Sequence, residues 1–448
     1  MAAQRTRWYD LVLIVLLTVA VLVSGCGSKA SPTPEPTPVP TKAPPTTAAP
    51  TQVPPTAVPV PTAKAARAPA KLTVWVYLSD ADLVVFQSVV DQYEAKTGDT
   101  VTVVNYPYFE LLAKVDVAFP AGEGPDLCEI PHTNTGVWGQ AGLIAPFPEG
   151  VLGEDERSKY MESALNAFFY DGQQYGIPQI ADVVVLLYNK KLVSKPPQTM
   201  EELIQMAKDI QTNDVGGFWM LDNNMWYGWC FVSGYGGYIF GKTETGYNLD
   251  DLGVFSRGAA QGLDYLFTLR KQHKIIPENI DWNLLTGRFT EGKLGMMIQN
   301  ANQAIIYAAA GVDVGMAVIP KLPNGEMPAP MLSISGWAIN GFGKQQQAAA
   351  ELAVFLGANL AVPLYKSASG NIPVRKDALT DPAIAGNPDI VAAIEEVGFS
   401  QPVPNVPEMG LVWTPVNSAF ELAAKGDKTS AQALFEAAEV VKAAIASQ

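Results

Sequence analysis

The chain has 448 residues, and its 44 acidic and 30 basic side chains give a formal net charge of −14 at pH 7. This balance argues against nucleic acid or an anionic membrane surface as a binding partner. The 3 cysteines and 2 histidines form no cluster with metal-ligand spacing. We therefore expect neither a metal site nor another cofactor.

The first 25 residues are predicted to be a signal peptide. Arg5 and Arg7 form a short positive region, and the apolar run at 11–23 is too short to span a hydrocarbon core of about 30 Å. The sequence Val-Ser-Gly-Cys that ends at Cys26 has the form of a lipobox. It predicts cleavage before Cys26 and a lipid on the thiol, which would anchor the protein to the outer side of the cell membrane. A simple secretory cleavage, or a lone buried cysteine, is the alternative.

Residues 26–70 are predicted to be a lipidated, disordered stalk. Between 31 and 62, proline alternates with threonine, valine and alanine, and such a segment cannot build a core. Its prolines favour an extended polyproline II conformation of about 3.1 Å per residue. A proline-rich ligand for a recognition domain is the alternative reading.

From residue 71 onward the composition is that of a globular protein long enough for two domains. Patterns typical of strands alternate with patterns typical of helices, which predicts a mainly parallel sheet covered on both faces. Strands are expected at 72–78, 100–104, 125–130, 183–188, 314–319 and 333–340. Helices are expected at 82–98, 109–119, 135–141, 258–272 and 430–446.

Two local motifs concern helix starts. Thr199 and Glu202 form a capping box, in which the hydroxyl accepts from the amide three residues on while the carboxylate reaches back. Residues 287–294 have the spacing of a phosphate-binding loop, but Leu294 stands where a hydroxyl must reach magnesium. We interpret this segment as a helix.

No sequence signature of a catalytic site is present. Nucleophile-elbow and zinc-protease motifs are absent from the sequence, and no carboxylate pair is singled out among the 44 acidic residues. Cys128 and Cys230 lie in apolar stretches and are expected to be buried free thiols, although their separation in sequence does not exclude a bridge. We expect a protein that is not an enzyme.

Aromatic residues gather in the segment FWMLDNNMWYGWC, which contains Trp226, and Trp413 lies in NVPEMGLVWTPVN. Sugars present apolar C–H faces that stack on aromatic rings, and hydroxyl rims that need amide and carboxylate partners. Aromatic residues interleaved with Asn and Asp meet both needs. Core packing explains the same rings equally well, so the residues alone do not decide.

Several segments occur in the order found in one family: KLTVWV, FPAGEGPDLCEIPH, GQAGLIAPF, YGIPQIADVVVLLYNKKLV with KPPQTMEEL, GYGGYIF, FTEGKLGMMIQN and VPNVPEM. In these the chain resembles the maltose/maltodextrin-binding branch of the solute-binding proteins of ABC importers. The resemblance implies a two-lobe periplasmic-binding-protein fold of the α/β class, with mainly parallel sheets, helices on both faces and a ligand cleft between the lobes. It places the N-terminal lobe at 71–180 and 330–380, and the C-terminal lobe at 181–329 and 381–448.

The resemblance also implies site residues. Trp226 falls where the family has a stacking tyrosine, Trp413 falls on a stacking tryptophan, and Asp182 falls on an acid that accepts from sugar hydroxyls. Asn224 stands where another acid is common. Other expected site positions depart from the maltose pattern, so the resemblance does not fix maltose as the ligand: Ser79, Asp80, His132, Thr133, Asn134, Asn302 and Asn417.

The resemblance implies a monomeric, membrane-tethered binding subunit of an ABC importer. It would capture an oligosaccharide by hinge closure and deliver it to the membrane permease subunits. Two rival functions are a binder of a charged solute with the same fold and a surface-anchored glycoside hydrolase. A purely structural surface protein is a third.

Overall fold

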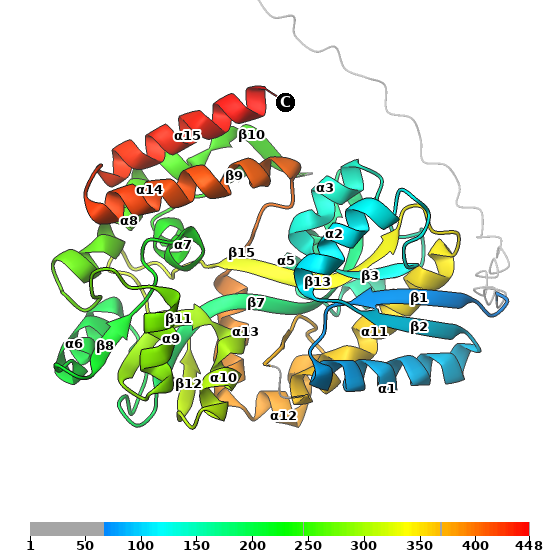
Figure 1. Cartoon of the computed structure of the whole chain (residues 1–448), viewed down its shortest axis with the longest axis horizontal. Helices are drawn as coiled ribbons and strands as arrows, with labels where there is room; N and C mark the ends of the chain where they lie inside the picture. Colours follow the sequence, from blue (N-terminus) through cyan, green and yellow to red (C-terminus); the bar gives the residue numbers. More distant parts are fainter. Residues whose placement is uncertain (1–66, 245, 368–369, 448) are drawn as a thin grey trace, which may run out of the picture. The chain divides into compact units, whose positions relative to one another are not determined.

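The protein is described from a computed structural model, which covers residues 67–244, 246–367 and 370–447. The expected signal peptide, Cys26 and nearly all of the expected stalk lie outside these residues. The described part is an α/β protein built around one large mixed sheet (Figure 1).

Seven strands form the main path of the sheet, in the order β2-β1-β3-β13-β7-β11-β8. Their bounds are β1 Lys71–Val76, β2 Thr100–Asn105, β3 Leu127–Pro131, β7 Gly176–Asn189, β8 Gly216–Trp219, β11 Leu294–Asn300 and β13 Met331–Asn340. Four short strands pair with β7 or β13: β4 Ile144–Ala145, β12 Val314–Ala317, β14 Ile372–Pro373 and β15 Gln401–Pro402. Two hairpins stand apart from it: β5 Phe169–Tyr170 with β6 Gln173–Gln174, and β9 Phe240–Lys242 with β10 Tyr247–Leu252.

The direction of pairing differs between the outer and the central strands. β1 pairs in parallel with β2 and β3, and β8 pairs in parallel with β11. The two long strands β7 and β13 are antiparallel to each other, β13 is antiparallel to β3, and β7 is antiparallel to β11. The parallel arrangement expected from the alternating pattern therefore describes the outer strands, and the central pair joins the two parallel groups.

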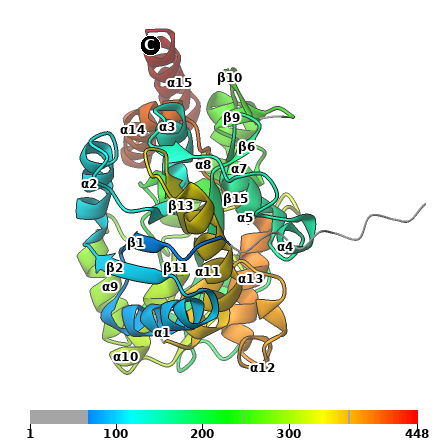
Figure 2. The same ribbon diagram turned by 90° about the vertical axis from the view of Figure 1, so that its right-hand side faces the viewer.

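Helices cover the sheet, and in Figure 2 α1 and α11 lie side by side over the group that contains β1 and β2. The helices are α1 Asp80–Thr97, α2 Tyr108–Ala118, α3 Thr135–Gln140, α4 Glu154–Arg157, α5 Glu162–Ala167, α6 Met200–Ile210, α7 Met225–Gly234, α8 Arg257–Lys271, α9 Trp282–Thr290, α10 Ala304–Ala309, α11 Gln346–Lys366, α12 Pro382–Ala385, α13 Pro388–Phe399, α14 Trp413–Lys425 and α15 Ser430–Ala446. The predicted helix at 430–446 coincides with α15, and the others agree to within two residues.

Helix ends follow the sequence signals with one difference. Gly98 ends α1 in the left-handed conformation, with φ of 77°. The Thr199 hydroxyl accepts from the Glu202 amide at 3.2 Å, as the capping box predicts. The Glu202 carboxylate accepts instead from the amide of Gln198, one residue earlier than expected, at 2.7 Å. The segment 287–294, interpreted as a helix, is helical only to Thr290; a turn follows, and Leu294 already begins β11.

Cys128 on β3 and Cys230 on α7 are both free and buried, which confirms the prediction. Burial raises the pKa of each thiol well above its usual value. Neither cysteine is therefore reactive at neutral pH.

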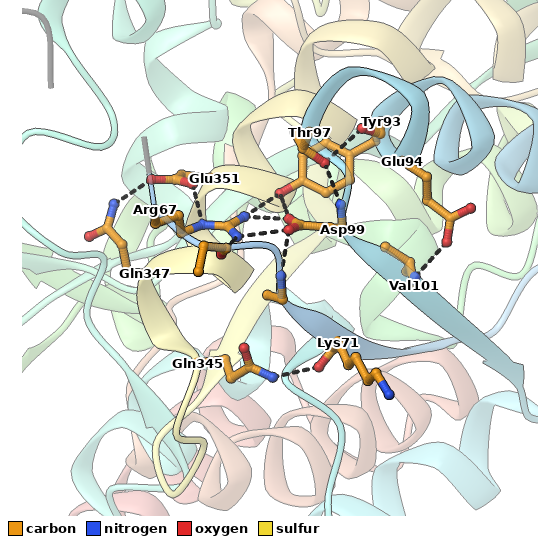
Figure 3. A network of polar contacts seen from close by, with 12 residues as sticks. Arg67, Lys71, Tyr93, Glu94, Thr97, Asp99, Val101, Gln345, Gln347 and Glu351 are labelled. Carbon is orange, nitrogen blue, oxygen red and sulfur yellow. Dashed lines mark hydrogen bonds and ion pairs between the residues drawn. The ribbon is translucent and has the colours of Figure 1, made fainter. Parts of the chain in front are cut away.

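An ionic network fixes the start of the described chain (Figure 3). Arg67 donates to Asp99 Oδ1 and to Glu351 Oε2, each at 2.8 Å. Asp99 is buried and also accepts from the Ala70 amide at 2.7 Å and from the Tyr93 hydroxyl at 2.9 Å. The segment before β1 is thus tied to the end of α1 and to α11. The Arg67 hydrogen bonds lower the pKa of Asp99 to about 2.

Replacing Asp99 by alanine is expected to lower the free energy of unfolding at pH 7 by about 2–4 kcal/mol, because Arg67 and the Ala70 amide lose their acceptor. The pKa of Asp99 falls from 3.8 in the unfolded chain to about 2 in the folded protein. The difference in free energy of unfolding between wild type and variant is therefore largest above pH 4 and decreases as the pH falls toward 2. Urea unfolding across this range measures both effects.

The control is Glu110→Ala, which removes an exposed partner of Lys114 at 3.5 Å. It should cost less than about 0.5 kcal/mol. Equal losses in the two variants would mean that the Arg67 network adds no more than an exposed ion pair.

Candidate binding site

Trp226 and Trp413 lie at the starts of two helices that are joined to each other. Trp226 is the second residue of α7 and Trp413 is the first residue of α14, and both rings are half-buried. The Asn417 Oδ1 atom accepts from the Met225 amide at 2.9 Å and so links the two helices. Residues four apart share a helix face, and Trp413 therefore lies on the α14 face that contacts α7.

A second chain of hydrogen bonds connects Trp226 to Asp182. The indole nitrogen of Trp226 donates to Asn300 Oδ1 at 3.3 Å. The amide nitrogen of Asn300 lies 2.9 Å from each carboxylate oxygen of Asp182. Asn300 ends β11 and pairs with Val184 on the neighbouring strand β7. Trp226 and Asp182 are thus connected through Asn300, which the sequence analysis did not single out, and Trp413 lies on the helix joined to α7.

Asp182 lies at a polar interruption of an otherwise buried strand. In β7 the other residues are buried apart from Ile180, whereas Asp182 is partly open to solvent. Burial raises the pKa of Asp182, and the hydrogen bonds from Asn300 oppose the rise. Each carboxylate oxygen has more than one lone pair, so Asp182 can accept from a further donor besides Asn300.

Two phenols lie within the electrostatic reach of Asp182. Burial raises the pKa of Tyr108 on α2 and of Tyr227 on α7, and the negative charge of Asp182 adds to both shifts. In Figure 1, α7 and α14 lie toward the left end of β7, and α2 lies toward its right end. Tyr108 and Tyr227 thus come from helices that lie toward opposite ends of β7, the strand that carries Asp182.

Another ring missed by the sequence analysis is Trp282, the first residue of α9. Its ring centroid lies 6.4 Å from that of Tyr227, and the side chain is 41% exposed. Asp281 caps this helix by accepting from the Leu284 amide at 2.8 Å. The signal was present in the sequence as a tryptophan directly after a capping residue, but only the fold brings it to Tyr227.

Asn224 and Asn417 have structural roles that the sequence did not predict. Asn224 caps α7, its Oδ1 accepting from the Trp226 amide at 2.9 Å. Asn417 accepts from the next amide toward the N-terminus, that of Met225. Each side-chain oxygen therefore accepts one backbone hydrogen bond, and both residues hold the first turn of α7, which carries Trp226. Their contact with a ligand stays a prediction.

The prediction that His132 contacts a ligand is wrong for this structure. The ring is fully buried, Nδ1 accepts from the Ile334 amide at 3.0 Å, and Nε2 lies 2.9 Å from the Val403 carbonyl oxygen. This pattern requires the neutral tautomer with its proton on Nε2. Burial lowers the pKa of His132 to about 4. Both nitrogens hold the chain beside β13, and neither is open to a ligand.

The remaining predicted residues are not joined to the Asp182 cluster by hydrogen bonds within the described residues. Ser79 caps α1 and both accepts from and donates to Asp82, and Asp80 is exposed at the first position of that helix. Three others lie in short 3₁₀ turns: Thr133 and Asn134, both half-buried, and Asn302, which is exposed. Their contact with a ligand stays a prediction.

In the described part of the chain, no group of three or more His, Cys, Asp or Glu side chains could hold a metal ion. The cluster around Asp182 instead combines half-buried rings, one carboxylate and amides fixed by backbone contacts. Such an arrangement binds an uncharged polar molecule with apolar faces.

A family model described as bacterial extracellular solute-binding protein matches residues 88–392. The chain belongs to this family. It is 31% identical over 391 residues to the galactooligosaccharide-binding protein of Bacillus subtilis (strain 168), which covers 86% of this chain and 91% of the relative. It is 29% identical over 375 residues to the maltotriose-binding protein of Pyrococcus abyssi, which covers 82% of this chain and 80% of the relative.

Solved structures give the same result. A cyclo/maltodextrin-binding protein in complex with maltotetraose matches with a TM-score of 0.79 and 30% identity, over 85% of this chain and 99% of that chain. A Staphylococcus aureus solute-binding protein in complex with maltose matches with a TM-score of 0.75 and 29% identity, over 85% and 98%. The family member described here has their two-lobe fold and is a binding protein, not an enzyme.

Replacing His132 by leucine tests its structural role. The variant should be less stable by about 2–4 kcal/mol at pH 7, because two buried backbone groups lose their partner. With a pKa of 6.5 unfolded and about 4 folded, the wild type loses stability as the pH falls from 6.5 toward 4, and its lead over the variant shrinks in this window. Denaturant unfolding at a series of pH values measures the lead.

His273, the other histidine, is half-buried and provides the control. Burial and Lys208 lower the pKa of His273 too, but its ring is only half-buried, so His273→Leu should change the pH dependence less than His132→Leu does. If the stability difference between the wild type and His132→Leu stays constant from pH 7 to pH 4, the buried ring titrates like a free one.

Proposed function

We propose that this protein captures an oligosaccharide outside the cell as the binding subunit of an ABC importer. The observation that carries this proposal is the chain from the Trp226 indole through Asn300 to Asp182, with Trp413 on the adjoining helix. It sets flat apolar rings beside a hydrogen-bond acceptor. The galactooligosaccharide- and maltotriose-binding relatives support the same ligand class.

The chemistry of the cluster suits a sugar ring. Half-buried indoles offer faces to the C–H groups of a pyranose, and a carboxylate with spare lone pairs accepts from its hydroxyls. The hydrogen bond that Trp226 gives to Asn300 fixes the orientation of its ring before a ligand arrives. A ring held in place loses less rotational freedom on binding, and this raises affinity.

Capture is proposed to proceed by hinge closure about β7 and β13. These strands run between the segments predicted as lobes, 71–180 with 330–380 and 181–329 with 381–448. The ligand shifts the population toward the closed form only by as much as it binds that form better. The closed form would then be the one presented to the permease subunits, near which the lipid on Cys26 would hold the protein.

Replacing either tryptophan by alanine is expected to weaken binding of the best ligand about tenfold, since stacking area at the site is lost. Isothermal titration calorimetry of the purified protein with maltotetraose and with galactooligosaccharides measures this. Phe435→Ala, which removes a ring that is exposed on α15, is the control and should not change the affinity. Full affinity in both tryptophan variants would assign the rings to packing alone.

The anchor is tested separately. Cys26→Ser is expected to release the protein from membranes into the medium, because a serine cannot carry the lipid through a thioether. Fractionation of expressing cells, with Cys128→Ser as the matched cysteine control, measures the distribution. Membrane retention of Cys26→Ser would mean that the anchor lies elsewhere.

The rival function, binding of a charged solute, is addressed in the same titrations by adding polyamines and ferric citrate to the panel. A charged solute that binds more tightly than every saccharide would replace the proposal. Within the described residues, no group of three or more His, Cys, Asp or Glu side chains supports a site for a ferric ion.

A further inference from the structure

Three aromatic rings form a row that begins at the end of β1 and continues onto α2. The ring centroids of Tyr77 and Tyr108 lie 5.0 Å apart with an interplanar angle of 78°. Those of Tyr108 and Phe109 lie 5.0 Å apart with an angle of 73°. We call these three residues the α2 aromatic row. Edge-to-face contacts of this kind hold each ring in a defined orientation.

The row is anchored at the strands that carry Asp182. The Tyr77 hydroxyl lies 2.5 Å from the Ser335 hydroxyl on β13. Ser335 pairs with Ile180 on β7, two residues before Asp182. Residues two apart on a strand point to the same face, so Asp182 shares with Ile180 the strand face next to this anchor. The electrostatic effect of Asp182 on Tyr108 agrees with this closeness.

Exposure increases along the row. Tyr77 is half-buried, Tyr108 is 38% exposed and Phe109 is 81% exposed, the highest value among the large apolar side chains in the described part of the chain. Core packing therefore does not account for Phe109. Phe109 continues a row that is anchored to the strand next to β7, and most of its surface is open to a ligand.

We propose that Tyr108 and Phe109 form a second stacking surface, which covers the sugar face turned away from Trp226 and Trp413 and selects sugars with C–H groups on both faces. This rests on the proposed function above. Trp226 and Trp413 come from α7 and α14, whereas the row comes from α2 and β1. Closure would bring the two surfaces onto opposite faces of one pyranose ring.

The stereochemistry of the sugar ring determines which oligosaccharides fit between two aromatic surfaces. In glucose and xylose units the ring hydroxyls are equatorial, and axial C–H groups point to both faces of the ring. In galactose the axial oxygen at C4 points to one face and would meet an aromatic surface that offers it no hydrogen bond, which is unfavourable. The proposal therefore assigns the site to glucose- or xylose-built oligosaccharides over galactose-built ones.

The test compares wild type, Tyr108→Ala and Phe109→Ala by calorimetric titration with maltotetraose, cellotetraose and β-1,4-galactotetraose. The wild type is expected to bind the better glucose-built probe about tenfold more tightly than the galactose-built one. Each alanine variant should weaken the glucose-built probe roughly three- to tenfold and leave the galactose-built probe unchanged. The selectivity of the variants should fall accordingly.

Two controls separate stacking from folding and from general surface effects. Tyr108→Phe keeps the ring and should retain the affinity of the wild type. Val117→Ala removes another exposed apolar side chain of the same helix and should leave every affinity unchanged. Melting temperatures of all variants show whether the fold is intact.

The outcomes distinguish this inference from the function on which it rests. If the wild type binds a saccharide, and the Trp226 and Trp413 variants weaken it while Tyr108→Ala and Phe109→Ala do not, the second surface is overturned and sugar capture stands. If Tyr108→Ala and Phe109→Ala weaken the binding of the glucose-built and galactose-built probes equally, the proposed selection for sugars with C–H groups on both faces is overturned. Binding of no saccharide by the wild type removes the proposed function and this inference together.

Discussion

The antiparallel pairing of β7 with β13 is the contact on which the site depends. β13 borders one parallel group through β3, β7 borders the other through β11, and the two strands pair with each other. Because β7 is buried almost throughout, its register is fixed, and a shift of one residue would exchange its two faces. That register decides where Asp182 lies and which neighbours it meets. The binding cluster is therefore held by backbone pairing before any side-chain contact is made.

Side-chain hydrogen bonds and ring contacts then connect β7 and β13 to the aromatic residues on the helices around them. Asn300 lies on the strand next to β7, where it donates to the Asp182 carboxylate and accepts from the Trp226 indole. Asn224 and Asn417 hold the first turn of α7 through its backbone amides. On the other side, Ser335 holds Tyr77, and Tyr77 holds Tyr108. Each aromatic surface thus has its own support from the same pair of strands. Under the proposed hinge closure, rotation about these strands would change the distance between the two surfaces while the contacts within each surface stay in place.

Much of this could be predicted from the sequence, and the remainder has a common physical cause. Helix limits such as α15 follow from local capping and periodicity, and the positions of Trp226, Trp413 and Asp182 follow from matched segments of the family. Asn300 and the α2 aromatic row could not be predicted, because their roles arise from strand order and from contacts between distant segments. The prediction for His132 is wrong for the opposite reason. A sequence shows that a side chain can form hydrogen bonds, but not that the backbone has already occupied them.

Burial disfavours the charged forms of two carboxyl groups, Glu129 beside Tyr77 and Asp182 in the candidate site, and this bears on the kind of ligand. Glu129 on β3 is buried beside Tyr77, whose amide donates to it at 3.2 Å, and burial raises its pKa to about 7. A carboxyl group with that pKa is protonated in about half of the molecules at neutral pH. Burial raises the pKa of Asp182 as well, and its nearest hydrogen-bond partner is a neutral amide. A site for a cation would gain from keeping both groups charged. Burial instead disfavours the charged form of each group, which suits an uncharged ligand better than a cation.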